Sequence, residues 1–217
     1  MSRDWSTSLS DHSPIAQSVL SVLEQFVDEF GIRECPSQVE YVVSGRYLDS
    51  SEIGQLPERF IEDHLVWPLL NVLGYEYLPQ PVGYPRWGNE VPDFAITNFE
   101  TTDEFAFIGE VKPPNNISNA RVQVKSYLKK DLGLNTLAIA TDGLNWELYF
   151  RHEKGECVVP LLKVGLRAII SKLQRRLFEK ESYRSFQIRG VLSDAKVEQL
   201  YRPNLEKRVS NKLNGTS

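Results

Sequence analysis

The sequence lacks the residues on which several enzyme classes depend. It has two cysteines, Cys35 and Cys157, far apart and with no second pair nearby, which supports neither a disulfide framework nor a thiolate zinc site. We expect both to be small buried side chains. His12, His64 and His152 are scattered and never form a His-Glu-x-x-His motif, which argues against a zinc hydrolase. A Gly-x-Ser-x-Gly elbow, which would hold a serine nucleophile, is also missing.

Long apolar runs are missing too. No stretch reaches the about 18 apolar residues that a membrane-spanning helix needs, so we expect no membrane association. The segment from Met1 to Ser13 is polar and has no apolar stretch of the kind found in secretory signals. We therefore expect the protein to stay in the cytoplasm, where association with the nucleoid is one option.

Charge is distributed unevenly along the chain. The net charge is -4 over 217 residues, a length that favours one domain with embellishments. Residues 1–62 hold eleven acidic and four basic side chains, whereas residues 163–190 hold eight basic and two acidic ones. The basic stretch is either a solvated helix face or a surface that contacts phosphates. The predicted nucleic-acid contacts in it are Arg167, Lys172, Arg175 and Arg176.

The first 55 residues are predicted to form an extension to the core domain. Pro14 follows a possible N-cap serine, and apolar residues at helical spacing continue to Gly31, which predicts a helix. The run 39–43 is rich in β-branched and aromatic residues and predicts a strand. The polar stretch 49–55 is interpreted as a linker.

A core domain over residues 56–162 is predicted from the elements that follow. Pro57 begins an amphipathic helix that Gly74 ends, and Pro68 within it should bend the chain or loosen one turn. The runs 91–97 and 105–112 are predicted to form an antiparallel hairpin. The remaining elements are a helix over 116–132, strands over 136–140 and 146–151, an edge strand over 157–160, and a basic helical extension over 163–217.

Three charged residues are the candidate catalytic residues. Asp93 follows a proline at the start of one predicted strand, and Glu110 and Lys112 end its hairpin partner. Side chains alternate along a strand, so Glu110 and Lys112 share a face while Val111 points away. Paired carboxylates suit Mg²⁺, and a lysine beside them can orient the attacking water and offset charge on a phosphate. Gly109 would permit close approach by a backbone or a ligand.

Five motifs in a fixed order resemble the PD-(D/E)XK nuclease superfamily, and in particular the amino-terminal endonuclease domains of type I restriction subunits and their stand-alone relatives. The similarity covers roughly residues 57–151. Its motifs are the helix from Pro57 to Tyr75, Val91-Pro92-Asp93, Gly109 to Pro114, Gln123-x-x-x-Tyr127, and Thr141-Asp142-Gly143-x-x-Trp146. The resemblance implies an α/β fold with a central mixed sheet flanked by helices, in the core order αβββαβ.

The resemblance also implies roles for residues at matching positions. Asp93 and Glu110 would bind Mg²⁺, with Mn²⁺ able to substitute, and the Val111 carbonyl would contribute a further ligand. Lys112 would act on the water and on the scissile phosphate. Glu62 would add an acid from the first core helix, although Glu58, four residues earlier, is an alternative. Catalytic Gln123 and nucleic-acid-binding Lys125 and Tyr127 would lie on the helix that follows.

The implied function is hydrolysis of DNA phosphodiester bonds in restriction, defence or repair, with RNA not excluded as a substrate. No Gly-Lys-Ser or Gly-Lys-Thr phosphate loop occurs, so we expect the protein to work alone or with a motor or specificity subunit that is a separate protein. The rival interpretation is an inactive nuclease-like module that binds nucleic acid or assembles a complex. The helix over 15–30 would then dock on a partner or on a second copy of the chain.

Overall fold

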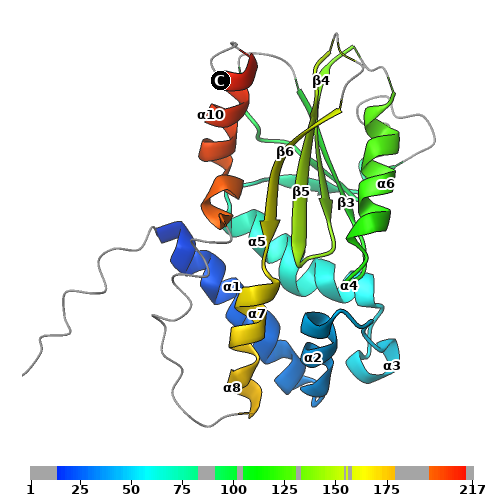
Figure 1. Ribbon diagram of the computed structural model, residues 1–217, viewed down its shortest axis with the longest axis vertical. Helices are drawn as coiled ribbons and strands as arrows, with labels where there is room; N and C mark the ends of the chain where they lie inside the picture. Colours follow the sequence, from blue (N-terminus) through cyan, green and yellow to red (C-terminus); the bar gives the residue numbers. More distant parts are fainter. Residues whose placement is uncertain are drawn as a thin grey trace, which may run out of the picture.

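The computed structural model describes residues 14–82, 91–101, 105–130, 133–153, 155, 158–178 and 196–213. Its centre is a six-stranded mixed sheet in the order β1-β2-β3-β4-β5-β6, flanked by helices (Figure 1). The strands are β1 Tyr77–Pro79, β2 Phe94–Ile96, β3 Phe105–Val111, β4 Asn135–Thr141, β5 Asn145–Arg151 and β6 Val158–Gly165. The predicted α/β class is confirmed.

The strands pair with their neighbours in sequence. All pairs are antiparallel except β3 and β4, which run parallel and are joined through helix α6, Ile117–Leu128. A parallel pair needs such a crossover, whereas antiparallel pairs close through short turns. The predicted hairpin of β2 and β3 and the predicted core order αβββαβ are confirmed. Helix α6 ends earlier than expected, and the predicted edge strand β6 is longer than expected.

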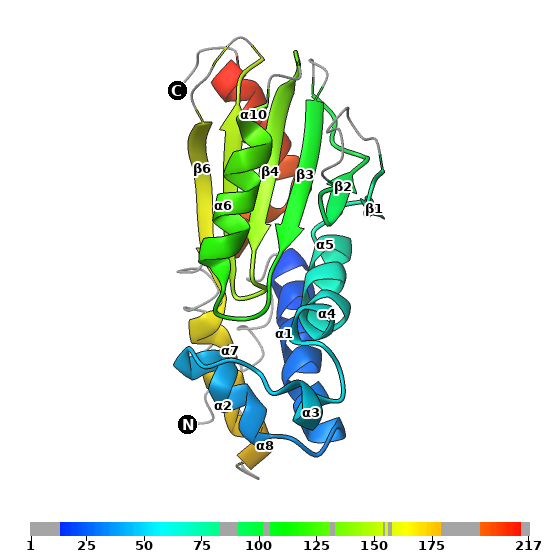
Figure 2. The same cartoon turned by 90° about the vertical axis from the view of Figure 1, so that its right-hand side faces the viewer.

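The two faces of the sheet carry separate apolar clusters because side chains alternate along each strand. On one face, Ile108 and Ala140 pack under α6 with Val124. On the other face, Phe107 and Ile139 join a larger cluster that includes residues of α1 and α10. The views agree that α6 and α10 lie on opposite faces, while α1, α2 and α7 gather below one end of the sheet (Figures 1 and 2).

The amino-terminal segment is more helical than predicted. The helix α1, Pro14–Ile32, is confirmed, but the predicted strand over 39–43 is wrong because this run lies in helix α2, Ser37–Ser44. Val39 and Val42, three residues apart, are both buried on one side of α2, so tertiary packing outweighs their strand propensity. The expected linker 49–55 contains the short helix α3, Ser50–Ile53, whose N-cap Asp49 accepts a 2.8 Å bond from the Ser51 amide.

The loosened turn expected at Pro68 is confirmed. Helix α4, Pro57–Ile61, passes into a π turn, η2 Glu62–Val66, and then into α5, Trp67–Val72. Pro68 has no amide hydrogen to donate to the carbonyl four residues earlier. The backbone widens before it, and the Trp67 amide bonds the carbonyl of Glu62, five residues earlier.

The carboxyl-terminal segment completes the core. The predicted basic helix is present in two pieces, α7 Arg167–Leu173 and α8 Arg175–Phe178, with the expected Ile169, Ile170 and Leu173 buried. A further helix within the predicted helical extension, α10 Arg202–Leu213, follows the turn η3, Val197–Leu200. Both α1 and α10 belong to the same apolar cluster as the sheet. The boundaries at residues 55 and 163 stay predictions.

The structure also tests the predictions for the cysteines, for the aromatic residues of β5 and for membrane-spanning helices. Cys35 is buried as expected, and Cys157 lies outside the described residues. Trp146, Tyr149 and Phe150 are buried side chains of β5, which confirms the interpretation of this aromatic group as core. No helix in the described ranges combines the length and the apolar character needed to cross a bilayer.

Candidate active site

The pairing of β2 with β3 brings Asp93 and Glu110 together. Phe94 pairs with Gly109, and continuing this antiparallel register by one residue places Asp93 opposite Glu110. Residues directly opposite in such a pair share a face and lie within about 5.5 Å of each other at Cβ. The Asp93 carboxylate accepts a 2.7 Å hydrogen bond from the Val111 amide. The side chain of Asp93 therefore ties the two strands together where regular pairing ends.

Gly109 is required where the two strands carry these acids. A Cβ atom on Gly109 would lie 1.9 Å from Cζ of the Phe94 ring, which is fully buried. The close approach that the sequence predicted at Gly109 is thus made by an aromatic side chain of the partner strand. It allows the Phe94 ring to cover β3 on the face of the sheet opposite to the Glu110 carboxylate.

The Lys112 ammonium lies among the acids. Its Nζ is 2.5 Å from Glu110 Oε1, 2.9 Å from the Val111 carbonyl oxygen and 3.8 Å from Asp93 Oδ2. Burial lowers the pKa of Lys112, but the hydrogen bond to Glu110 and the nearby carboxylates outweigh it, so the net pKa is raised. The lysine stays charged and offsets one of the two negative charges of the acid pair.

Glu110 is completely buried and has a second partner on α6. The Tyr127 hydroxyl is 3.0 Å from Glu110 Oε2, and the Gln123 amide donates to the Tyr127 oxygen at 2.8 Å. Of the two predicted neighbours, Tyr127 therefore contacts Glu110 directly, and Gln123 is linked to Glu110 through Tyr127. Burial, followed by the charge of Asp93, raises the pKa of Glu110 to about 7, although the bonds from Lys112 and Tyr127 oppose the rise.

This raised pKa predicts a pH dependence of stability without metal. The pKa of Glu110 is about 7 in the folded protein, against 4.5 for an ordinary glutamate. Between these values the folded state binds a proton that the unfolded chain has lost, so the unfolding free energy should fall as pH rises from about 5 to about 7, by about 1.4 kcal/mol per unit of pKa difference. Urea unfolding in EDTA at a series of pH values measures it.

The matched variant for this measurement is Glu110→Gln, which cannot ionise. Its unfolding free energy should fall less than that of the wild type between about pH 5 and about pH 7, because the contribution of Glu110 ionisation is removed. His64 has a lowered pKa, mainly through burial, and so acts in the opposite direction. The informative quantity is consequently the difference between wild type and variant. If the difference in unfolding free energy between wild type and variant does not change with pH over this range, the raised pKa of Glu110 is wrong.

A second group of acids converges on Asp93 from helix α4 and the π turn. Carboxylate oxygens of Glu58, Glu62 and Asp93 all lie within 4.8 Å of one another. Burial raises the pKa of both glutamates, and the Asp93 charge adds to it. Glu62 is also paired with Arg59 at 3.0 Å. Both helix acids that the sequence left as alternatives thus lie beside Asp93.

The donor set of this group fits a small hard cation. Opposite ligands of Mg²⁺ are about 4.2 Å apart, twice a metal–oxygen bond of roughly 2.1 Å, which is close to the 4.8 Å limit of the group. Three partly buried carboxylates supply the oxygens that Mg²⁺ and Mn²⁺ prefer. Glu110, also predicted as a ligand, is not in this group of carboxylates. Its Oε1 atom and the Val111 carbonyl oxygen, the other predicted ligand, both accept hydrogen bonds from the Lys112 ammonium.

The turn between β4 and β5 fixes the acidic helix against the sheet. Gly143 has a φ of +79°, which favours glycine, and a Cβ there would lie 2.5 Å from Ile61 Cγ2. Asp142 is buried and accepts bonds from the amides of Leu144 and Asn145. The predicted Asp142-Gly143 turn is confirmed, and its tight contact with Ile61 explains how the acids of α4 keep their place near Asp93.

The predicted cationic contacts are not gathered around the acids. Lys125 is exposed on α6, with its ammonium 5.5 Å from the centre of the Tyr149 ring. Arg167 bonds backbone carbonyls of α2, and Lys172 and Arg175 are exposed on helices that run away from the sheet (Figure 1). The side chain of Arg176 lies outside the described residues. Their role in nucleic-acid binding stays a prediction.

One residue of the site region was missed from the sequence. Asn115 has a φ of +69° and its amide bonds backbone carbonyls at the end of α2. An asparagine that follows two prolines is a signal for a turn, but its partners are about 70 residues away in the chain. Only the folded structure could identify them.

Comparisons with known proteins agree with a nuclease-type relationship. An alignment over 150 residues, which covers 65% of this chain, is 28% identical to a protein of Methanocaldococcus jannaschii named "Putative type II restriction enzyme and methyltransferase RM.MjaORFECS2P". The matched stretch covers 12% of that larger protein. No family model matches the chain, and no solved structure matches it.

Proposed function

We propose that this protein is a metal-dependent nuclease that hydrolyses DNA phosphodiester bonds. The observation that carries the proposal is the convergence of Glu58, Glu62 and Asp93 beside the Glu110–Lys112 pair. Hard oxygen ligands next to a charged lysine are the groups that phosphodiester hydrolysis requires. The similarity to a restriction enzyme supports the same class of reaction.

Each side chain has a distinct role in this proposal. Asp93, Glu58 and Glu62 would hold Mg²⁺ or Mn²⁺, which when bound polarises a phosphate oxygen and lowers the pKa of a bound water. Glu110 and the Val111 carbonyl would join them once Lys112 turns toward the substrate. Lys112 would then hold the attacking water and neutralise charge that develops on the phosphate. Tyr127, itself bonded by Gln123, would orient Glu110.

The substrate and partners are proposed on chemical grounds. The exposed cations Lys125, Lys172 and Arg175 would contact phosphates of DNA, and RNA is the alternative to be tested beside it. A motor or specificity subunit would be supplied by a separate chain. The restriction enzyme that this chain resembles is far longer than the matched stretch, so the activity of that whole protein is not carried over.

A cleavage assay tests the proposal. Purified protein is incubated with supercoiled plasmid in Mg²⁺, in Mn²⁺ and in EDTA, with single-stranded DNA and RNA in parallel. We expect cleavage of DNA with either metal and none in EDTA, because the acids need the cation to act. Asp93→Asn is the matched variant, since it keeps the size of the side chain but removes the charge.

Three results of these experiments would contradict or extend the proposed nuclease function. Cleavage in EDTA, or equal cleavage by Asp93→Asn, would rule out the proposed centre. Binding of DNA without cleavage under every metal condition would favour the rival function, an inactive nuclease-like module. Size-exclusion chromatography with light scattering on the same sample reports whether the chain forms a homodimer.

A further inference from the structure

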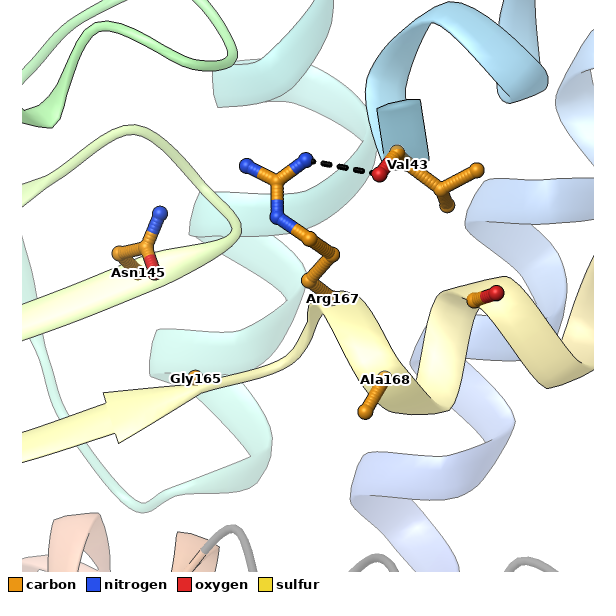
Figure 3. Close-up of a pocket in the computed structure, with 6 residues that line it drawn as sticks. Val43, Asn145, Gly165, Arg167 and Ala168 are labelled. Carbon is orange, nitrogen blue, oxygen red and sulfur yellow. Dashed lines mark hydrogen bonds between the residues drawn. The ribbon is translucent and has the colours of Figure 1, made fainter. Parts of the chain in front are cut away.

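The end of helix α2 is bonded by two side chains from distant parts of the chain. The last carbonyls of a helix have no partner within the helix. Arg167 donates from Nη1 to the carbonyls of Val42 and Val43, at 2.7 and 3.0 Å. The Asn115 amide donates to the carbonyls of Arg46 and Val42, at 2.6 and 3.3 Å. Figure 3 shows Arg167 reaching from the start of α7 to the Val43 carbonyl.

The two side chains also bond each other. The Arg167 Nη2 group donates to Asn115 Oδ1, so both ends of the Asn115 amide are engaged. Asn115 takes a φ of +69°, a conformation that side chains other than glycine adopt rarely and asparagine adopts most readily. We call Asn115, Arg167 and the carbonyls of Val42, Val43 and Arg46 the Asn115 clamp. It joins α2, the start of α7 and the loop that follows β3.

That loop is short and stiff, and it begins at Lys112. Only Pro113 and Pro114 separate Lys112 from Asn115, and proline fixes its own φ and restricts the residue before it. The Lys112 amide donates to the Thr141 carbonyl at 2.9 Å, and Pro114 is buried. A displacement of Asn115 is therefore transmitted to Lys112, because the two prolines leave few rotations to absorb it.

We propose that Asn115 is a positioning residue for the nuclease reaction. Through the Asn115 clamp it holds the segment 112–115 against α2, which fixes the backbone from which the Lys112 side chain reaches the acids and the substrate. The inference rests on the proposed function, because it assigns Asn115 a role through Lys112. It also gives the amino-terminal helix α2 a part in the site, although α2 carries none of the acids.

Asn115→Gly is the sharpest test. Glycine tolerates the positive φ, so the variant removes the amide without imposing backbone strain. The single-turnover cleavage rate should fall about 10- to 100-fold, the effect of a small misplacement in an active site. DNA affinity in EDTA, measured by fluorescence anisotropy, should stay unchanged. Asn115→Asp, which retains an oxygen for Arg167 but cannot donate to the carbonyls, should behave similarly.

The matched control is Glu34→Gly. Glu34 also has a positive φ, +58°, and is exposed in the loop after α1, so its variant should cleave at the wild-type rate. A wild-type rate in Asn115→Gly, or parallel losses of rate and DNA affinity, would overturn the inference.

Hydrogen exchange separates this inference from the proposed function. The Lys112 amide should exchange faster in Asn115→Gly than in wild type, whether or not the wild type cleaves DNA, because its bond to the Thr141 carbonyl depends on a fixed loop. Unchanged exchange over residues 112–116 refutes the clamp. A wild type that fails to cleave DNA refutes the function, while the exchange result still decides whether the clamp exists.

Discussion

Replacement of Lys112 by methionine is expected to lower the rate of metal-dependent DNA cleavage by about 10²- to 10⁴-fold, the range for a group that assists proton transfer or stabilises charge. Methionine keeps the length and apolar stem of the side chain but removes the ammonium, which is 2.5 Å from Glu110 and 3.8 Å from Asp93. Single-turnover cleavage of a labelled duplex with excess enzyme measures the chemical step directly. Saturating Mn²⁺ should not restore the rate.

The matched control is Lys129→Met, at an exposed lysine next to the end of α6. It removes one positive charge at the end of α6 that is remote from Lys112 (Figure 2), so any general effect of net charge on DNA binding appears in both variants. We expect its chemical step to equal that of the wild type. Equal rates in the two variants would mean that Lys112 contributes only charge to binding, and the proposed mechanism would be wrong.

Gly109→Ala is expected to destabilise the protein by about 3 kcal/mol or more, at the upper end of the cost of adding a methyl group to a packed core. The new Cβ would lie 1.9 Å from the Phe94 ring, far inside the contact distance, and Phe94 is fully buried. The change also separates β2 from β3 where Asp93 meets Glu110. Urea unfolding followed by circular dichroism measures the loss.

Two further variants make this measurement specific. Gly165→Ala is the control, because the nearest atom to its Cβ, Asn145 Oδ1, is 4.0 Å away, and we expect a change within about 0.5 kcal/mol. Phe94→Ala opens space for the methyl group, so Gly109→Ala should cost less in that background than in wild type. Simple additivity of Phe94→Ala and Gly109→Ala would contradict the predicted contact.

The local pattern of apolar and polar residues along the sequence was sufficient to predict most of the fold. The alternation in β3 predicted that Glu110 and Val111 face opposite sides, and they do. The hairpin between β2 and β3 followed from two strand-like runs and a turn, and it predicted the meeting of Asp93 with Glu110. In each case the partners are neighbours along the sheet, so short-range periodicity contains the necessary information.

Contacts between distant segments could not be predicted in this way. The strand expected over 39–43 is a helix because Val39 and Val42 pack into the core below the sheet, a partner that no local window contains. The pairing of Arg167 with Asn115 joins residues 52 positions apart. The sequence also could not show that Lys112 bonds Glu110 and the Val111 carbonyl, because two carboxylates and several carbonyls are within its reach.

The widened turn before Pro68 determines how the side chains of α5 are rotated about the helix axis relative to those of α4. Each residue of an α-helix advances by about 100° around the axis, so the extra residue in η2 rotates everything that follows relative to Glu58. A chain shortened by one residue there would turn Leu69 and Leu70 by about 100°, away from the core that buries them. The length of this turn thereby couples the direction in which the acids point to the packing of α5, and insertions or deletions within it would disturb both together.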